Sequence, residues 1–285
     1  GATFMKSSGE YKAVAVIDTI EDRIIPQSLE LLAFIKQIYK CDFSDILLVV
    51  AGINTTDVTG KLAENYGIDI AAAEHDDFYY PNPSLLIKVL YSVIEKYNPE
   101  VLCFTHTIRN CSTAAALSAL FTIQCITGVE TFSEKEKVFE FQRSMFNGKL
   151  KENVRVTGQQ VILTINPGAF ELSADYKFSE REASIETTGV DPGIHGYKPL
   201  SLSENSDIES SIEDADVIIA AGRGIGKPEN LQMVKDMAQL FDNAAIGASR
   251  PVCDNKWLPY RHQVGVTGKT VSPKLYMALG ISGSQ

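Results

Sequence analysis

The chain has 285 residues, of which 45% are hydrophobic and 22% charged, and its formal net charge at pH 7 is -10. This composition is typical of a globular protein, and the length predicts about two domains. The acidic balance argues against a nucleic-acid partner, because binding a phosphate backbone requires a basic surface. No apolar run is long enough for a membrane-spanning helix, so stable membrane insertion is not expected.

Cysteine and histidine usage gives no sign of a disulfide framework or a zinc site. The five cysteines are odd in number and include no CxxC pair, which predicts free thiols in a reducing compartment. The four histidines are scattered without the spacing of metal ligands. The sequence therefore predicts no bound metal.

The first half alternates short apolar runs with helical periodicity, which predicts a doubly wound parallel sheet with helices on both faces. After Gly128 the pattern changes to short strands, and Asn147-Gly148 is a hairpin signal, so an antiparallel edge is expected on this sheet. The predicted strands are 12–18, 45–51, 100–105, 137–145, 155–156 and 160–165, and the predicted helices are 27–40, 56–66, 83–97 and 112–121.

Periodicity fades between residues 171 and 214, where the chain carries prolines and an acidic, serine-rich run. This composition is typical of a linker. We therefore predict an α/β protein of two domains, with an N-terminal α/β domain at 1–170, a linker or crossing segment at 171–214 and a second domain at 215–285.

A glycine-rich turn, Gly222-Arg223-Gly224-Ile225-Gly226, lies between a predicted strand at 216–221 and a predicted helix at 228–241. Glycine at this place lets backbone approach a ligand, and the helix N-terminus offers N–H groups to an anion. The spacing is GxGxG rather than GxGxxG, and no acidic residue stands at the ribose position. The pattern alone fits a plain βα turn as well as a nucleotide site, and Arg223 favours the site.

Three further features are candidates for ligand contacts. Ser249 and Arg250 follow a run of small residues at 244–248, where they offer a hydroxyl and a cation or simply a surface arginine. The two glycine-lined turns at 265–268 and 280–283 hold Thr267 and Ser282, which are either ligand-facing or solvent-facing. His106 and Arg109 follow a strand end, but nothing in the sequence completes a catalytic triad.

These features occur in one order, DVIIAAGRGIGKPEN and then GASRPVCDNKWLPYRHQVGVTGKTVSPKLYMALGISGS. This stretch resembles the carboxy-terminal FAD domain of the electron-transfer flavoprotein alpha subunit. The first half carries TGVETF and NPGAF, which are compatible with the first domain of that family. The resemblance implies a Rossmann-like FAD-binding domain. The family continues beyond GISGA, so the resemblance also implies that this domain is incomplete and that the chain is truncated at its C-terminus.

The resemblance assigns roles to individual residues. Arg223 would lie near the flavin or its phosphates, and Ser249 and Arg250 would flank the isoalloxazine, where the charge of Arg250 favours reduced, anionic flavin. Thr267 would hydrogen-bond to flavin N5. The remaining cofactor contacts would be Gln263, Val264, Gly265 and Val266 along the ring, and Ser282, Gly283, Ser284 and Gln285 along the ribityl–diphosphate side.

The resemblance also implies partners. The family works as a heterodimer with a beta subunit that carries AMP or a second FAD. It takes electrons from acyl-CoA dehydrogenases or similar flavoenzymes, so we expect an electron carrier rather than a substrate-specific enzyme, in some cases a bifurcating one. A bacterial chain would be cytoplasmic and a eukaryotic one would lie in the mitochondrial matrix. Two alternatives stay open, an NAD(P)-binding oxidoreductase domain and an assembly subunit without cofactor.

Overall fold

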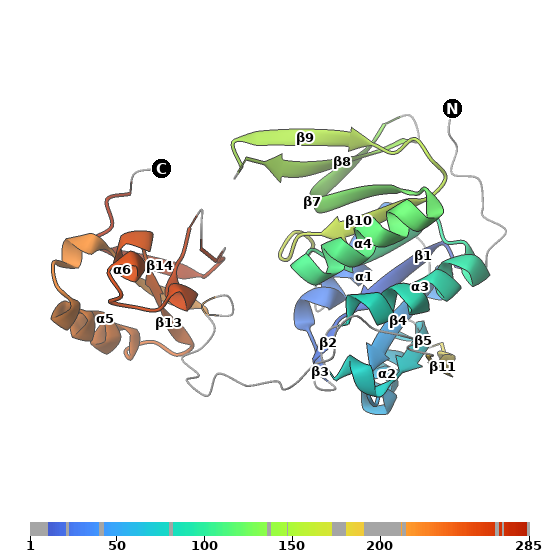
Figure 1. Cartoon of the computed structure of the whole chain (residues 1–285), viewed down its shortest axis with the longest axis horizontal. Coiled ribbons are helices and arrows are strands. Elements are labelled where there is room, and N and C mark those ends of the chain that lie inside the picture. Colours follow the sequence, from blue (N-terminus) through green and yellow to red (C-terminus); the bar gives the residue numbers. More distant parts are fainter. Residues whose placement is uncertain are drawn as a thin grey trace. The chain divides into compact units, whose positions relative to one another are not determined.

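A computed structural model describes residues 11–20, 23–39, 43–79, 82–135, 138–146, 148–172, 181–190, 212, 215–265, 268–269 and 271–283. Internal contacts divide the chain into two compact units, residues 1–202 and residues 203–285 (Figure 1). We refer to them as unit 1 and unit 2 and describe each by itself.

The described residues of unit 1 form a nine-stranded sheet in the order β11-β5-β4-β1-β6-β10-β7-β8-β9. Its strands pair in parallel from β11 to β7, and β8 and β9 add an antiparallel edge. The predicted mixed α/β architecture with a large parallel sheet is confirmed. The strands are β1 Ala13–Ile17, β4 Ile46–Gly52, β5 Asp69–Glu74, β6 Val101–Thr105, β7 Gln124–Lys135, β8 Val138–Met145, β9 Leu150–Arg155, β10 Val161–Ile165 and β11 Ile185–Gly189, with a separate two-stranded ribbon of β2 Thr19–Ile20 and β3 Arg23–Ile24.

Helices cover both faces of this sheet, because crossover helices join β1 to β4, β4 to β5, β5 to β6 and β6 to β7 (Figure 1). Two apolar layers result. One holds Phe34 and Leu62 from α1 and α2, and the other holds Leu90 and Leu117 from α3 and α4. The helices are α1 Glu30–Tyr39, α2 Thr56–Tyr66, α3 Pro83–Tyr97 and α4 Ile108–Phe121, with short 3₁₀ turns at Pro26–Leu29, Phe43–Asp45 and Asp76–Phe78.

Local signals set the helix ends. Helix α3 spans the predicted residues, and its N-terminal cap is Asn82. The Asn82 side chain accepts a hydrogen bond from the Leu85 amide at 3.1 Å, while Pro83 occupies the first turn, where no amide hydrogen is needed. Helix α2 ends at Gly67, as predicted, with a left-handed φ of 62° that glycine adopts without strain.

Sequence periodicity did not predict β5, β7 or β11, and it predicted a strand only at residues 155–156 where β9 spans Leu150–Arg155. Strand β11 lies within the segment expected to be a linker, and it pairs in parallel with β5. Asp69, at the start of β5, accepts hydrogen bonds from the Ser184 amide at 2.7 Å and from Arg181 at 2.8 Å. Contacts distant in sequence therefore form this edge, which explains why local apolar pattern missed it. The domain limits 1–170, 171–214 and 215–285 stay a prediction.

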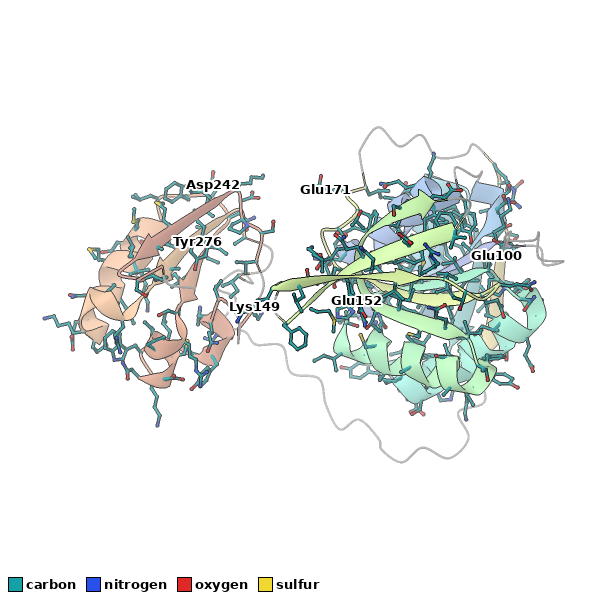
Figure 2. The ribbon with its side chains drawn as sticks, turned by 90° about the horizontal axis from the view of Figure 1, so that it is seen from above. Glu100, Lys149, Glu152, Glu171, Asp242 and Tyr276 are labelled. Atoms are coloured by element: carbon teal, nitrogen blue, oxygen red, sulfur yellow. The ribbon has the colours of Figure 1, made fainter. Side chains whose placement is uncertain are left out.

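The antiparallel edge ends in the β8–β9 hairpin. Figure 2 shows Lys149 at its turn. Two other residues of this turn have left-handed backbone, Phe146 with a φ of 50° and Gly148 with a φ of 79°. Arg143 and Glu152 pair across the hairpin at 2.6 Å. The Asn-Gly signal thus predicted the hairpin correctly, while Asn147 itself lies outside the described residues.

The described part of unit 2 forms a small parallel sheet of three strands in the order β13-β12-β14. The segment between the two glycine-lined turns, left unassigned by its sequence, is strand β14. The helix predicted at 228–241 is shorter and starts with a 3₁₀ turn at Pro228–Asn230. The elements are β12 Val217–Ala221, β13 Ala244–Ala248, β14 Leu275–Leu279, α5 Leu231–Ala238 and α6 Arg250–Asp254, with further 3₁₀ turns at Arg223–Ile225 and Tyr260–His262.

Phe34 is fully buried and its ring contacts those of Phe132, Phe141 and Phe170, with centroids 6.0, 6.3 and 5.0 Å away. We expect Phe34→Ala to lower the free energy of unfolding by about 3–5 kcal/mol, because it leaves a cavity among these rings. The matched control is Phe146→Ala, at a side chain that is 70% exposed, with an expected change within about 0.5 kcal/mol. Urea unfolding followed by far-UV circular dichroism measures both, and equal effects would contradict this packing.

Candidate cofactor site

The three strands of unit 2 end level with one another. Ala221 of β12 lies opposite Ala248 of β13 on one side and Leu279 of β14 on the other, and all pairs are parallel. The segments that follow, beginning at Gly222 and Ser249, therefore start at one edge of the sheet, as does the turn at Gly280. The carboxyl edge of a parallel sheet is where α/β proteins bind their ligands.

Two of these segments interlock through their backbones. The Gly222 amide donates to the Leu279 carbonyl at 2.8 Å, and the Gly224 amide donates to the Gly280 carbonyl at 2.9 Å. A Cβ on Gly222 would lie 2.1 Å from the Gly280 oxygen, and Gly280 has a φ of 68°. The close approach that the glycines permit is thus to the neighbouring turn, not only to a ligand as the sequence suggested.

Arg223 lies in the 3₁₀ turn after β12 and its side chain is exposed. This turn, together with Gly226 at a φ of 88°, forms the start of the chain leading to α5. Trp257 packs against the apolar core of unit 2. The Arg223 side chain is therefore accessible to solvent, whereas the Trp257 side chain packs on the apolar core.

Ser249 carries the clearest sign of a ligand. Its amide donates to the Ala221 carbonyl at 2.9 Å, but its Oγ is buried and has no hydrogen-bond partner among the described residues. A buried hydroxyl without a partner costs about 1–3 kcal/mol. A polar ligand atom at this edge would remove that cost, so Ser249 fits a cofactor with hydrogen-bonding groups.

Arg250 begins helix α6 and is tied to an acidic neighbour. Its Nε lies 3.4 Å from Oδ2 of Asp254, and 63% of its side chain is exposed. The Tyr260 hydroxyl donates to the other oxygen of Asp254 at 2.7 Å, and this hydrogen bond to the carboxylate raises the pKa of Tyr260. One carboxylate thus holds both a cation and a phenol next to Ser249.

The segment Gln263–Gly265 lies against the end of β13. The Val264 amide donates to the Ala248 carbonyl at 2.9 Å, and Gln263 is only 3% exposed. After β14 come Ser282 and Gly283, whose φ is 70°. The structure therefore brings the described candidates to one edge of unit 2. The other four predicted contacts, Val266, Thr267, Ser284 and Gln285, lie outside the described residues.

His106 and Arg109, the candidates in unit 1, have structural partners. His106 Nδ1 lies 2.7 Å from Thr164 Oγ1 and 3.4 Å from Cys111 Sγ. Burial lowers the pKa of His106 and raises the pKa of Cys111, so both groups are neutral near pH 7 and the thiol is not an activated nucleophile. Arg109 forms an ion pair with the buried carboxylate of Asp18.

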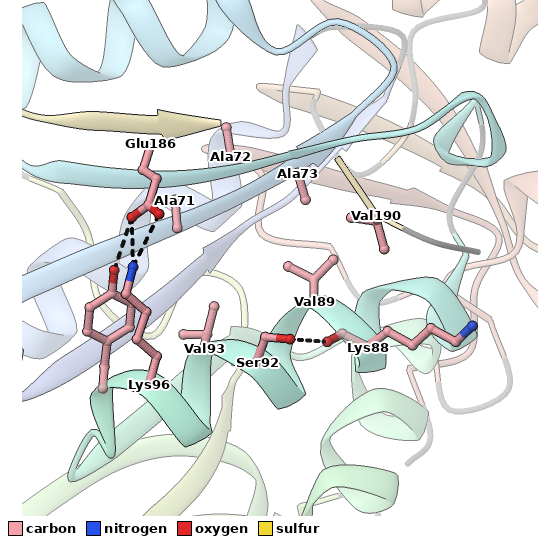
Figure 3. A pocket seen from close by; sticks show the side chains of 11 residues that line it. Ala71, Ala72, Ala73, Lys88, Val89, Ser92, Val93, Lys96, Glu186 and Val190 are labelled. Carbon is pink, nitrogen blue, oxygen red and sulfur yellow. Dashed lines mark hydrogen bonds and ion pairs between the residues drawn. The ribbon is translucent and has the colours of Figure 1, made fainter. Parts of the chain in front are cut away.

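Unit 1 also contains a cavity of about 440 Å³ that the sequence did not predict. Figure 3 shows it between helix α3 and strands β5 and β11. Small side chains of β5, from Ala71 to Ala73, leave the space, and Lys96 reaches Glu186 at 2.9 Å on its rim. The run of three consecutive alanines was the sequence feature that could have indicated this cavity. None of the predicted site residues lines this cavity.

Two searches over the described residues were negative. No cluster of three or more potential metal-ligating side chains occurs in that part of the chain. Of the helices described, none has the length and apolar character needed to cross a membrane.

Comparison with known families gives the assignment. The family model described as "Electron transfer flavoprotein domain" matches residues 14–192, and the model described as "Electron transfer flavoprotein FAD-binding domain" matches residues 211–285. The chain belongs to the electron transfer flavoprotein family, as an alpha subunit. The alternative of an NAD(P)-binding oxidoreductase is not favoured by these matches.

Curated relatives agree with this assignment. The chain is 28% identical over 242 residues to "Electron transfer flavoprotein subunit alpha" of Syntrophomonas wolfei, covering 84% of this chain and 75% of the relative. It is 29% identical over 243 residues to the protein of the same name from Bacillus subtilis, covering 84% and 73%. It is 25% identical over 294 residues to "Acryloyl-CoA reductase electron transfer subunit beta" of Anaerotignum propionicum, covering 93% and 80%.

Because the turns at Gly222 and Gly280 are in backbone contact, adding one methyl group at Gly222 should strongly affect the stability of unit 2. Gly222→Ala should destabilise unit 2 by about 1–3 kcal/mol or more, because the new Cβ overlaps the Gly280 backbone. Urea unfolding followed by the fluorescence of Trp257, the single tryptophan, measures this effect. The matched control is Gly60→Ala in α2, where nothing lies within 4 Å and a gain of about 0.5–1 kcal/mol is expected by circular dichroism. An unchanged midpoint for Gly222→Ala would contradict the interlock.

Proposed function

We propose that the carboxyl edge of unit 2 binds FAD and that the chain carries electrons as the alpha subunit of a heterodimer. The observation that carries the proposal is the level ending of β12, β13 and β14, which gathers Arg223, Ser249 and Arg250 at one edge. The unpaired Oγ of Ser249 adds a group that needs a polar partner. The match of residues 211–285 to the FAD-binding domain model supports the same cofactor.

The residues present suit this cofactor. Bound flavin supplies the redox chemistry, and the protein sets its affinity and potential through nearby dipoles and charges. Arg223, exposed in a turn, is suited to pair with a phosphate oxygen, since its guanidinium offers several donors in a fixed fork. Ser249 would donate its hydroxyl hydrogen to the ring, and Gln263, Val264 and Gly265 would line it.

Arg250 would place a positive charge beside the flavin. Its interaction with Asp254 holds the guanidinium in position and at the same time offsets part of its charge. A cation next to the ring favours added negative charge, and a carboxylate opposes it. The two side chains would therefore act on the flavin potential with opposite signs.

The remaining contacts are proposed on the family resemblance. Thr267 would hydrogen-bond to flavin N5 and Val266 would lie beside the ring. Ser282, Gly283, Ser284 and Gln285 would follow the ribityl–diphosphate side, where the turn after β14 begins. Backbone N–H groups in glycine-rich turns are suited to phosphate oxygens.

The partners are proposed in the same way. An electron-transfer flavoprotein beta subunit, carrying AMP or a second FAD, would complete the heterodimer. An acyl-CoA dehydrogenase-type flavoenzyme would deliver electrons, and the Anaerotignum propionicum relative is named as an electron transfer subunit of acryloyl-CoA reductase. The chain would thus be a carrier rather than a substrate-specific enzyme, working in the bacterial cytoplasm or, in a eukaryote, in the mitochondrial matrix.

The direct test is cofactor content of the assembled heterodimer. We expect the chain, co-produced with the beta subunit of its own organism, to be yellow and to contain FAD in stoichiometric amount in unit 2. A stable heterodimer that stays colourless and takes up no added FAD would overturn the proposal in favour of an assembly subunit. Tight NADH binding without flavin would favour the NAD(P) alternative.

The charges around Arg250 predict shifts of opposite sign. Arg250→Gln should lower the flavin midpoint potential by tens of millivolts, and Asp254→Asn should raise it, because one change removes a cation and the other an anion. Spectroelectrochemical titration of the heterodimer measures both shifts.

The control for this pair is Lys235→Gln in α5, an exposed residue whose helix returns the chain to the opposite edge of the sheet. Removing the positive charge of Lys235 should change the flavin midpoint potential by only about a few millivolts, because solvent and salt screen a distant exposed charge. Shifts of the same sign for Arg250→Gln and Asp254→Asn would remove Arg250 from the proposed site.

A further inference from the structure

His262 is buried beneath the proposed site, although the sequence gave it no role. Its side chain is 3% exposed, and its Nδ1 lies 2.9 Å from the carbonyl oxygen of Ile246 in strand β13. Because a carbonyl oxygen carries no hydrogen, this bond requires the hydrogen to be on Nδ1. The imidazole therefore acts as a donor to the backbone of a strand.

The position of Ile246 explains why this donor matters. Strand β13 is the last strand of the described sheet in unit 2, so one of its sides has no neighbouring strand. Carbonyls two residues apart point to the same side of a strand. The Ala248 carbonyl accepts from the Val264 amide and the Ile246 carbonyl accepts from His262, so both bonds lie on this free side.

His262 thereby fixes the start of the segment that would hold the flavin. The residue after it, Gln263, forms an isolated parallel bridge with Ala248. The Gln263 carbonyl then accepts from the Lys269 amide at 2.8 Å, and a Cβ on Gly268 would lie 2.3 Å from that carbonyl oxygen. A displacement at His262 would consequently shift Gln263 to Gly265, together with Gly268 and Lys269, which contact Gln263.

We propose that His262 is a positioning residue for the FAD site, whose Nδ1–H holds Gln263–Gly265 against the free side of β13. This inference rests on the proposed function, because it names the residue that places part of that site. This positioning role differs from simple packing in the apolar core, because it depends on one hydrogen-bond donor, Nδ1–H, at one position. A side chain with a donor at that position should therefore replace histidine.

The test compares three substitutions. His262→Asn keeps an N–H donor the same number of bonds from Cα as Nδ1, His262→Gln moves the donor one bond further out, and His262→Leu keeps apolar volume without a donor. A fourth variant, Val234→Ala, removes buried methyl groups from α5 in the same unit and leaves every hydrogen-bonding group in place. It controls for loss of stability alone.

The first readout needs no cofactor. Amide hydrogen exchange of a fragment spanning residues 259–265, measured on the heterodimer before FAD is added, reports the bond from Val264 to Ala248. We expect exchange to be about tenfold faster in His262→Leu and His262→Gln, and close to wild type in His262→Asn and Val234→Ala.

The second readout is FAD affinity of the same heterodimers, by titration with free FAD. We expect about tenfold weaker binding for His262→Leu and His262→Gln, with recovery in His262→Asn. Wild-type exchange rates in His262→Leu would overturn the inference, as would a loss in His262→Asn equal to that in His262→Leu.

The two proposals fail in different ways. If the wild-type heterodimer binds no FAD, the proposed function fails, while the exchange data still decide whether His262 anchors the segment. If the wild type binds FAD and all three His262 variants bind it equally well, the positioning role fails and the proposed function stands.

Discussion

Parallel pairing in register is the constraint on which the site depends. Because β13, β12 and β14 end level with one another, the segments that follow them begin within reach of each other. Glycines at 222, 224 and 280 then let two of these turns share backbone hydrogen bonds at a distance that a side chain would prevent. Backbone geometry therefore defines this edge of the sheet, and it positions the charged and polar side chains there.

The polar groups at this edge differ in how firmly they are held. The Ser249 backbone is fixed by the hydrogen bond that its amide donates to the Ala221 carbonyl, while its Oγ has no hydrogen-bond partner among the described residues. Arg250 is mostly exposed and depends on Asp254 for its orientation, and Asp254 in turn accepts from Tyr260. A hydroxyl on a rigid strand end and a cation on a tethered side chain suit different tasks, namely a defined hydrogen bond and a longer-range field.

Unit 1 uses the same kind of sheet differently. Two groups at its own strand ends have partners within the protein, since Asp18 pairs with Arg109 and His106 contacts Thr164, whereas the buried Oγ1 of Thr105 has no hydrogen-bond partner among the described residues. Burial keeps Cys111 and His106 uncharged, which removes the activated thiol that a catalytic role would need. The larger of two cavities in the described part of unit 1 lies between α3, β5 and β11 and is lined by small and apolar side chains together with Lys88, Lys96 and Glu186. A smaller cavity adjoins Asp18 and Arg109 at the strand ends.

The sequence by itself determined the elements whose signals are local. Apolar runs specified β1, β4, β6 and β12, helical periodicity specified α2 and α3, and the order of glycine-rich motifs identified the family and the candidate residues at the edge of unit 2. Only the tertiary structure decided the features that depend on partners distant in the chain. Strand β11 pairs with β5, where Asp69 accepts hydrogen bonds from Ser184 and Arg181, and Gly222 lies against Gly280 because β12 lies beside β14. The role of His262 is invisible in sequence for the same reason, since a lone histidine gives no periodic signal and its acceptor, the Ile246 carbonyl, is a backbone atom of another strand.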